Sequence, residues 1–273
     1  MIMKRQGFVF ILAATVLAVL SGGTFMTRSV AFAAAPERKL MAHFTTYYGE
    51  SAEGRKHNIA LAASRIDGVT LYPEDEFSFN DYVGKRTEAG GFKTAYVIVD
   101  GEYKEGVGGG VCQVSSTLYN CALLAGLVVT CVRAHSLPVS YVAPSFDAMV
   151  STVSDLRFVN TLSAPVTLRM TADGKYLRAE IYGYDGEDIR RRSETIKTLP
   201  YTTEFREDPT LAFGEEKVDT YGKNGLISEG YLDYFKDGKL VKSVLIRRDA
   251  YAPQKQIILR GIKPSDPLPD DTP

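Results

Sequence analysis

Residues 106–126 read Gly-Val-Gly-Gly-Gly-Val-Cys-Gln-Val-Ser-Ser-Thr-Leu-Tyr-Asn-Cys-Ala-Leu-Leu-Ala-Gly. Three consecutive glycines lead into Cys112, and the apolar residues that follow recur at the spacing of one helix face. Glycine permits tight turns and close approaches that a Cβ prevents. Cys112 is therefore predicted where a tight loop becomes a helix, which ends near Gly126. Backbone N–H groups and the positive end of the helix dipole meet at such a position, and both favour a thiolate.

Cys112 is accordingly the first candidate catalytic residue. His135 and Asp147 follow it along the chain, and they are suited to act as the base and as the group that orients the base. The loop residues Gly109, Gly110 and Gln113 are predicted to shape an oxyanion hole, with a backbone N–H of Cys112 or Gln113 as the donor. The candidate substrate-binding residues are Ser115, Ser116, Tyr119 and Arg133.

The same residues also permit a purely structural interpretation. Glycines would then shape a packing turn, Cys112 would be a small buried residue, His135 would bond to backbone and Asp147 would cap a turn. A third hypothesis makes Ser115 or Ser116 the nucleophile. The polar string after Cys112 favours a functional site, catalytic or binding.

Composition excludes several classes of function. The chain has 273 residues, 45% of them hydrophobic and 24% charged, which is ordinary for a globular protein. A formal net charge of -1 gives no field that would attract nucleic acid. The chain has three histidines and no short-spaced Cys/His pairs, so no metal site and no cofactor is predicted.

The N-terminus has the layout of a targeting segment. Lys4 and Arg5 precede an apolar run, 8–20, which is shorter than the ~20 residues that span a bilayer. Small residues follow around Ala31-Phe32-Ala33. Residues 1–35 are therefore predicted to be a secretory signal peptide, with an uncleaved membrane anchor as the alternative. Either one places the rest of the chain outside the cytoplasm, secreted, wall-associated or tethered to the membrane.

The three cysteines, Cys112, Cys121 and Cys131, lie in one short window. An odd number in an exported protein leaves at least one thiol unpaired or intermolecular. We expect Cys121 and Cys131 to be buried free thiols, and a disulfide between them is the alternative.

The remaining pattern predicts an α+β protein. Residues 36–185 are expected to form a mixed domain with two helices, one of them at 58–66, and an antiparallel sheet. Its predicted strands and hairpin lie at 44–48, 69–72, 95–103, 127–133, 139–142, 156–160, 166–170 and 177–184. Residues 186–199 are charged and are expected to be a solvated linker. A small all-β module is predicted at 200–262, followed by a disordered Pro/Asp tail, 263–273.

Residues 44–170 resemble the VanW family of bacterial exported proteins. The resemblance rests on Arg55 with Asn58-Ile59, Phe77-Ser78-Phe79-Asn80, Val83-Gly84, the stretch 108–120, Arg133, His135-Ser136, Tyr141-Val142, Asp147-Ala148, and Asp155-Leu156 with Phe158. It implies a role in the cell envelope, without implying a particular reaction. The chain departs from the family pattern at Pro144-Ser145-Phe146, where glycine and a basic residue are common. The family takes its name from an accessory gene of vancomycin-resistance clusters.

The C-terminal module, 200–262, is similar to the glycine-signature surface domain called G-five. The similarity rests on Gly222, Gly225, Gly238, Tyr251, Pro253 and Gly261. It implies binding to polymers that contain N-acetylglucosamine, so peptidoglycan or wall glycan is the expected partner.

Two functional hypotheses follow. The first is a Cys–His acyl-transfer or amidase-type enzyme, a hydrolase or transpeptidase that acts on peptidoglycan peptides. The order of Cys, His and acid is similar to that of papain and transglutaminase. The second is a non-catalytic glycan-binding or envelope-assembly protein, with a link to glycopeptide resistance as one option.

Overall fold

The structure is a computed structural model that describes residues 38–99, 102–184 and 186–263. The predicted signal segment, the expected turn at Asp100-Gly101 and the predicted tail beyond residue 263 lie outside these residues. Within the described part of the chain, no helix is long and apolar enough to cross a membrane.

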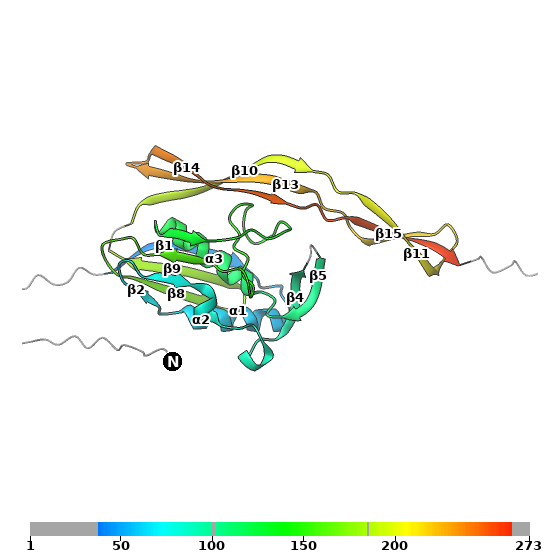
Figure 1. Ribbon diagram of the computed structural model, residues 1–273, viewed down its shortest axis with the longest axis horizontal. Coiled ribbons are helices and arrows are strands. Elements are labelled where there is room, and N and C mark those ends of the chain that lie inside the picture. The colour runs from blue at the N-terminus through cyan, green and yellow to red at the C-terminus, as the bar shows by residue number, and fades with distance from the viewer. Residues whose placement is uncertain (1–37, 100–101, 185, 264–273) are drawn as a thin grey trace, which may run out of the picture. The chain divides into compact units, whose positions relative to one another are not determined.

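The first sheet carries the core of the N-terminal part. It is antiparallel, in the order β1 (Lys39–Tyr47), β9 (Tyr176–Gly183), β8 (Val166–Ala172) and β2 (Thr70–Leu71). Side chains alternate along β9, with Leu177, Ala179 and Ile181 fully buried, as expected for a strand with one covered face. Helix α3 (Val111–Leu124) packs against β1 and β9, and α1 (Glu53–Ile66) packs against β8 and α3 (Figure 1).

Helix α3 is buried along almost its whole length. It begins after Gly110, which has φ +103°, and it is followed by Gly126, with φ +75°. Both values lie in the left-handed region that glycine adopts without steric cost. Because polar side chains on α3 are also buried, each needs a hydrogen-bond partner from the surrounding chain. These partners position the candidate site.

Smaller elements surround this core. They are the sheet β3 (Glu76–Ser78), β7 (Arg157–Val159) and β6 (Val128–Cys131), the helix α2 (Phe79–Val83), a 3-10 turn at Glu88–Gly90, and the hairpin of β4 (Thr94–Val99) with β5 (Glu102–Val107). The segment 139–142, predicted as a strand, is irregular. Pro138 and Pro144 flank it and lack the N–H group that a ladder needs. Cys121 is buried as expected, but Cys131 is exposed, so the expectation for Cys131 was wrong.

The C-terminal part is all β. One sheet has the order β10 (Asp188–Leu199), β13 (Gly225–Lys236) and β14 (Lys239–Tyr251). The other has the order β11 (Thr203–Ala212), β15 (Gln256–Lys263) and β12 (Glu216–Thr220), with β11 parallel to β15. Together with the helices of the N-terminal part, these sheets confirm the predicted α+β class.

The charged segment 186–199 forms strand β10 over most of its length, instead of the predicted linker. Its arginine side chains contact residues of the neighbouring strand β13. The Arg192 guanidinium lies over the Tyr231 ring and donates to Asp233, and Arg190 lies over Phe235. A pattern of charged residues therefore belongs here to a paired strand whose arginines cover aromatic rings.

Candidate functional site

A connection without helix or strand, residues 132–156, brings His135 and Asp147 to the start of α3. Polar side chains of α3 hold this connection. Ser115 Oγ donates to the Ala148 carbonyl at 2.6 Å, Ser116 Oγ accepts from Ala148 N at 2.9 Å, and Asn120 Nδ2 donates to the Phe146 carbonyl at 2.7 Å. Because these bonds are buried, they fix the backbone on both sides of Asp147.

Cys112 is the second residue of α3, and its thiol donates to the Val150 carbonyl at 3.4 Å. The glycines before it are required by close contacts. A Cβ on Gly109 would lie 2.4 Å from the Tyr96 carbonyl oxygen, and one on Gly110 would lie 2.9 Å from Arg55 Cγ. The run of glycines therefore lets the first turn of α3 pack directly against β4 and α1.

His135 and Asp147 form a tight buried pair. Asp147 Oδ2 accepts from His135 Nδ1 at 2.6 Å and from the backbone N–H of the same residue at 2.7 Å. Asp147 is fully buried and His135 is 7% exposed. These two bonds from His135 to Asp147 Oδ2 fix the orientation of the imidazole ring and of the carboxylate. The other ring nitrogen, Nε2, is then free to face the Cys112 thiol.

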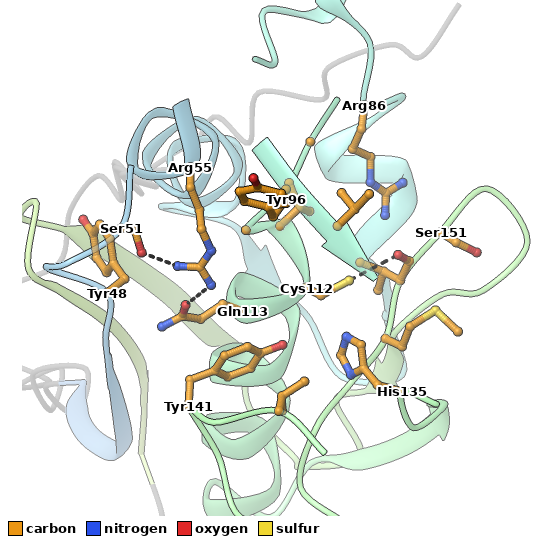
Figure 2. A pocket seen from close by; sticks show the side chains of 18 of the residues that line it. Tyr48, Ser51, Arg55, Arg86, Tyr96, Cys112, Gln113, His135, Tyr141 and Ser151 are labelled. Carbon is orange, nitrogen blue, oxygen red and sulfur yellow. Dashed lines mark hydrogen bonds between the residues drawn. The ribbon is translucent and has the colours of Figure 1, made fainter. Parts of the chain in front are cut away.

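Figure 2 shows the His135 ring beside the Cys112 sulfur in the pocket. Burial alone would raise the pKa of the Cys112 thiol, but the hydrogen bond and charge of His135, with the charge of Arg86, lower it. Burial would lower the pKa of His135, but Asp147 and Cys112 raise it to about 9. Burial would raise the pKa of Asp147, but His135 and Tyr251 lower it. The directions of the three shifts each favour the charged form of the group: thiolate for Cys112, imidazolium for His135 and carboxylate for Asp147.

A cavity of about 770 Å³ opens on this pair. Its lining includes Tyr48, Tyr96 and Tyr141 with Arg55 and Arg86 (Figure 2), and it also includes Glu50. Burial and the charge of Cys112 raise the pKa of Tyr141, so its hydroxyl remains a proton donor at the pocket wall. A cavity of this size accommodates a ligand as large as a short peptide segment.

The other predicted site residues have structural positions. The Gln113 side chain accepts from Arg55 Nη2 at 2.6 Å and donates to Thr46 and Tyr47, and its backbone N–H donates to the Gly110 carbonyl. Because the Gln113 N–H already donates to the Gly110 carbonyl, it does not supply the expected oxyanion donor. The backbone N–H of Cys112 has no acceptor among the described residues, so it remains available for that role.

The four predicted substrate-binding side chains do not line the cavity. Ser115 and Ser116 are fully buried, and Ser116 donates to the Cys112 carbonyl at 2.7 Å. Tyr119 is buried beneath the Arg247 guanidinium. Arg133 is exposed, and its carbonyl accepts from Met149 N. These residues hold the helix and its connection in place, since sequence spacing alone cannot show which face of a fully buried helix meets the pocket.

Sequence reasoning missed Arg86 and Tyr141 as pocket residues. Arg86 Nη2 donates to Asn80 Oδ1 at 2.6 Å. The uncharged Asn80 amide therefore positions the Arg86 guanidinium near Cys112. Tyr141 was noted for the family resemblance alone, and the irregular segment that carries it gives no periodic signal.

Comparisons with known proteins match two regions of the chain. Residues 54–182 match the sequence model of the family "VanW like protein", and residues 190–263 match the model "G5 domain". The "Uncharacterized protein YoaR" of Bacillus subtilis (strain 168) is 42% identical over 153 residues, which are 56% of this chain and 50% of that protein. The chain thus spans about half the length of this relative.

The remaining similarities are narrower. The "Zinc metalloprotease ZmpC" of Streptococcus pneumoniae serotype 4 is 38% identical over 64 residues, 23% of this chain and 3% of that protein. The solved "IgA1 Protease G5 domain structure" is 26% identical, with a TM-score of 0.20, over 29% of this chain and 96% of that one. The HP0197-G5 crystal structure is 26% identical, with a TM-score of 0.17, over 27% of this chain and 97% of that one. The chain combines a VanW-like region with a C-terminal G5 domain.

Proposed function

We propose that this protein is an extracytoplasmic, cell-wall-associated acyl-transfer enzyme that uses Cys112 as its nucleophile on amide bonds of peptidoglycan peptides. The observation that carries the proposal is the series of half-buried Cys112, buried His135 and buried Asp147, of which Cys112 and His135 line the cavity. A thiol, a base and an orienting acid in this order are the parts that covalent acyl transfer needs.

Each group has a defined task in the reaction. The Cys112 thiolate attacks the amide carbonyl carbon and forms a tetrahedral intermediate, whose oxyanion accepts from the Cys112 N–H and the Tyr141 hydroxyl. The C–N bond then breaks, the leaving amine takes its proton from His135, and a thioester remains. Water or a second amine resolves the thioester after His135 removes its proton. Asp147 keeps His135 oriented throughout.

The substrate class follows from the pocket and from the C-terminal region. Aromatic walls suit peptide backbone, and the cations Arg55, Lys85 and Arg86 among the lining residues suit the carboxylates of wall peptides. The G5 region would hold the enzyme on wall glycan while the pocket acts on the attached peptides. Retention on the polymer raises the effective concentration of substrate at the pocket.

The test is the reactivity of Cys112. The purified protein is alkylated with iodoacetamide across about pH 4 to 9, which brackets free and activated thiols, and mass spectrometry assigns the site. We expect Cys112 to react well below the free-thiol pKa of about 8.5, and His135→Ala to abolish this low-pH reaction. Cys131, an exposed free thiol in the same chain, is the internal reference.

A Cys112 that stays unlabelled until the protein unfolds would exclude the enzyme. The alternative is then a non-catalytic wall-binding protein, which the thiol donation from Cys112 to the Val150 carbonyl favours because it is a satisfied structural contact. Co-sedimentation with intact cell walls, with and without residues 190–263, tests that alternative.

A further inference from the structure

The Asp147 carboxylate receives its third hydrogen bond from the C-terminal sheet. Tyr251, the last residue of β14, donates its hydroxyl to Asp147 Oδ1 at 2.6 Å, on the oxygen that His135 does not use. The same hydroxyl accepts from Ser145 N at 2.7 Å. Arg247, four residues earlier on β14, donates to the Asp147 carbonyl at 2.7 Å. Tyr251 and Asp147 are both buried, so water does not compete for these bonds.

The connection that carries Asp147 is held by three strands of that sheet. Ser193 on β10 donates to the Pro144 carbonyl at 2.8 Å, and Ser228 on β13 shares a 2.7 Å bond with the Ser145 hydroxyl. Gly230 leaves room for Ser145, since a Cβ there would lie 3.0 Å from the Ser145 Cβ. Ser145 has φ +65°, a conformation that costs a residue with a Cβ free energy. The contacts from the sheet therefore stabilise a backbone that would be strained without them.

We infer that the G5 region forms part of the catalytic site, with Tyr251 as a positioning residue that holds the Asp147 carboxylate toward His135. This inference rests on the proposed function and identifies the side chain that orients its carboxylate. One carboxylate oxygen accepts twice from His135. A buried second oxygen without a donor would favour rotation of the carboxylate, because an unsatisfied buried acceptor is costly.

The remaining ionisable groups around the pair do not replace Tyr251. Arg247 Nη2 lies 3.7 Å from Asp147 Oδ1, beyond hydrogen-bond distance, and it pairs with Asp249. Arg86 and Tyr141 interact electrostatically with the Cys112 thiol, which lies on the side of His135 away from Asp147. Tyr251 is thus the side chain that donates to Oδ1 in the described part of the chain.

The test uses Tyr251→Phe in the full chain, which removes one oxygen atom. The readouts are the imidazole titration of His135 by NMR, assigned among the three histidines with His135→Ala, and the pH midpoint of Cys112 alkylation. We expect the His135 pKa to fall by about 0.5 to 1, the size that one hydrogen bond supports, and the alkylation midpoint to rise. In an Asp147→Asn background the effect of Tyr251→Phe on His135 should vanish, because Tyr251 acts through that carboxylate.

The matched control is Ser228→Ala, which loosens the same connection without touching Asp147. It should leave the His135 titration in place even where the melting temperature falls. An unchanged His135 titration in Tyr251→Phe overturns the inference, as does an equal shift in Ser228→Ala or a shift that persists beside Asp147→Asn. If wild-type Cys112 is reactive at low pH, these results overturn the role of Tyr251 alone. If it is unreactive, the proposed function falls and the catalytic role of Tyr251 with it.

Discussion

Asp147→Asn should disable the acid–base pair and also destabilise the protein. The carboxylate accepts from His135 N, His135 Nδ1 and Tyr251 Oη, all at 2.6–2.7 Å. An amide offers one oxygen and one NH₂ group. Whichever way it turns, its NH₂ faces a donor that the carboxylate satisfied. We expect a loss of about 3–5 kcal/mol in the free energy of unfolding, as for breaking a buried ion pair.

The effect on chemistry can be calculated from His135. With a pKa of about 9, this imidazole is almost fully protonated at about pH 7.5, whereas at the unperturbed pKa of about 6.5 roughly one in ten would be. Cys112 also raises this pKa, so a full return to the unperturbed value is the upper limit, at which the imidazolium is about tenfold scarcer. The rate of Cys112 alkylation at that pH should fall by up to that factor.

The assay combines alkylation rates with urea unfolding of the same samples. Asp233→Asn is the control, because Asp233 is also a buried carboxylate, paired with Arg192 and Ser243 on the C-terminal sheet. It should lower stability and leave Cys112 reactivity unchanged. An Asp147→Asn protein that alkylates at the wild-type rate while folded would refute the role given to the carboxylate.

Three further predictions follow from the same contacts. Gly109→Ala places a Cβ 2.4 Å from a backbone oxygen, so it should cost about 1–3 kcal/mol of unfolding free energy in a urea titration; a melting temperature equal to wild type would contradict the close approach. Arg86→Gln removes the cation that lowers the Cys112 pKa, so the alkylation midpoint should rise, and an unmoved midpoint would assign the shift to His135 alone. Cys112→Ala leaves Asp147 as the group that raises the pKa of His135, so the variant should lose stability as the pH rises from about 6.5 through a folded pKa below the wild-type value. In the wild type the lowered Cys112 pKa acts with the opposite sign over the same range, so unfolding midpoints from pH 6.5 to 8.5 should be flatter than those of the variant.

Much of the fold was predictable because it has local periodicity. The strands near 44–48, 166–170 and 177–184 alternate, and the glycine run before Cys112 precedes a helix, as the structure has them. Strand β10 was not predicted, because its arginines are typical of a solvated segment until the rings of β13 are placed opposite them. Local pattern cannot report a partner that lies far along the chain.

The residues of the candidate site could be predicted from the sequence, whereas the contacts that hold them in place could not. Residue type and order led to Cys112, His135 and Asp147, and the structure brings these three together. The contact from Tyr251 joins residues that lie 104 positions apart. The sequence carried one hint, the departure at Pro144-Ser145-Phe146, which is where the connection meets the C-terminal sheet.

Opposite charges alternate along this site, and this alternation favours His135 as the group that holds the proton of Cys112. In the charged forms that the pKa shifts favour, the groups from the pocket inward are the Cys112 thiolate, the His135 imidazolium, the Asp147 carboxylate, the Arg247 guanidinium and Asp249. Each buried charge has an opposite neighbour, which offsets the cost of removing it from water. Proton transfer from His135 to Asp147 is unfavourable, because Tyr251 donates to Asp147 Oδ1 and the pKa of Asp147 is lowered. In the proposed reaction, the proton that leaves Cys112 would therefore stay on the imidazole, from which it can pass to the leaving amine. In the proposed reaction, the C-terminal strand that supplies both Tyr251 and Arg247 would hold these charges in place, so the G5 region would contribute to the chemistry.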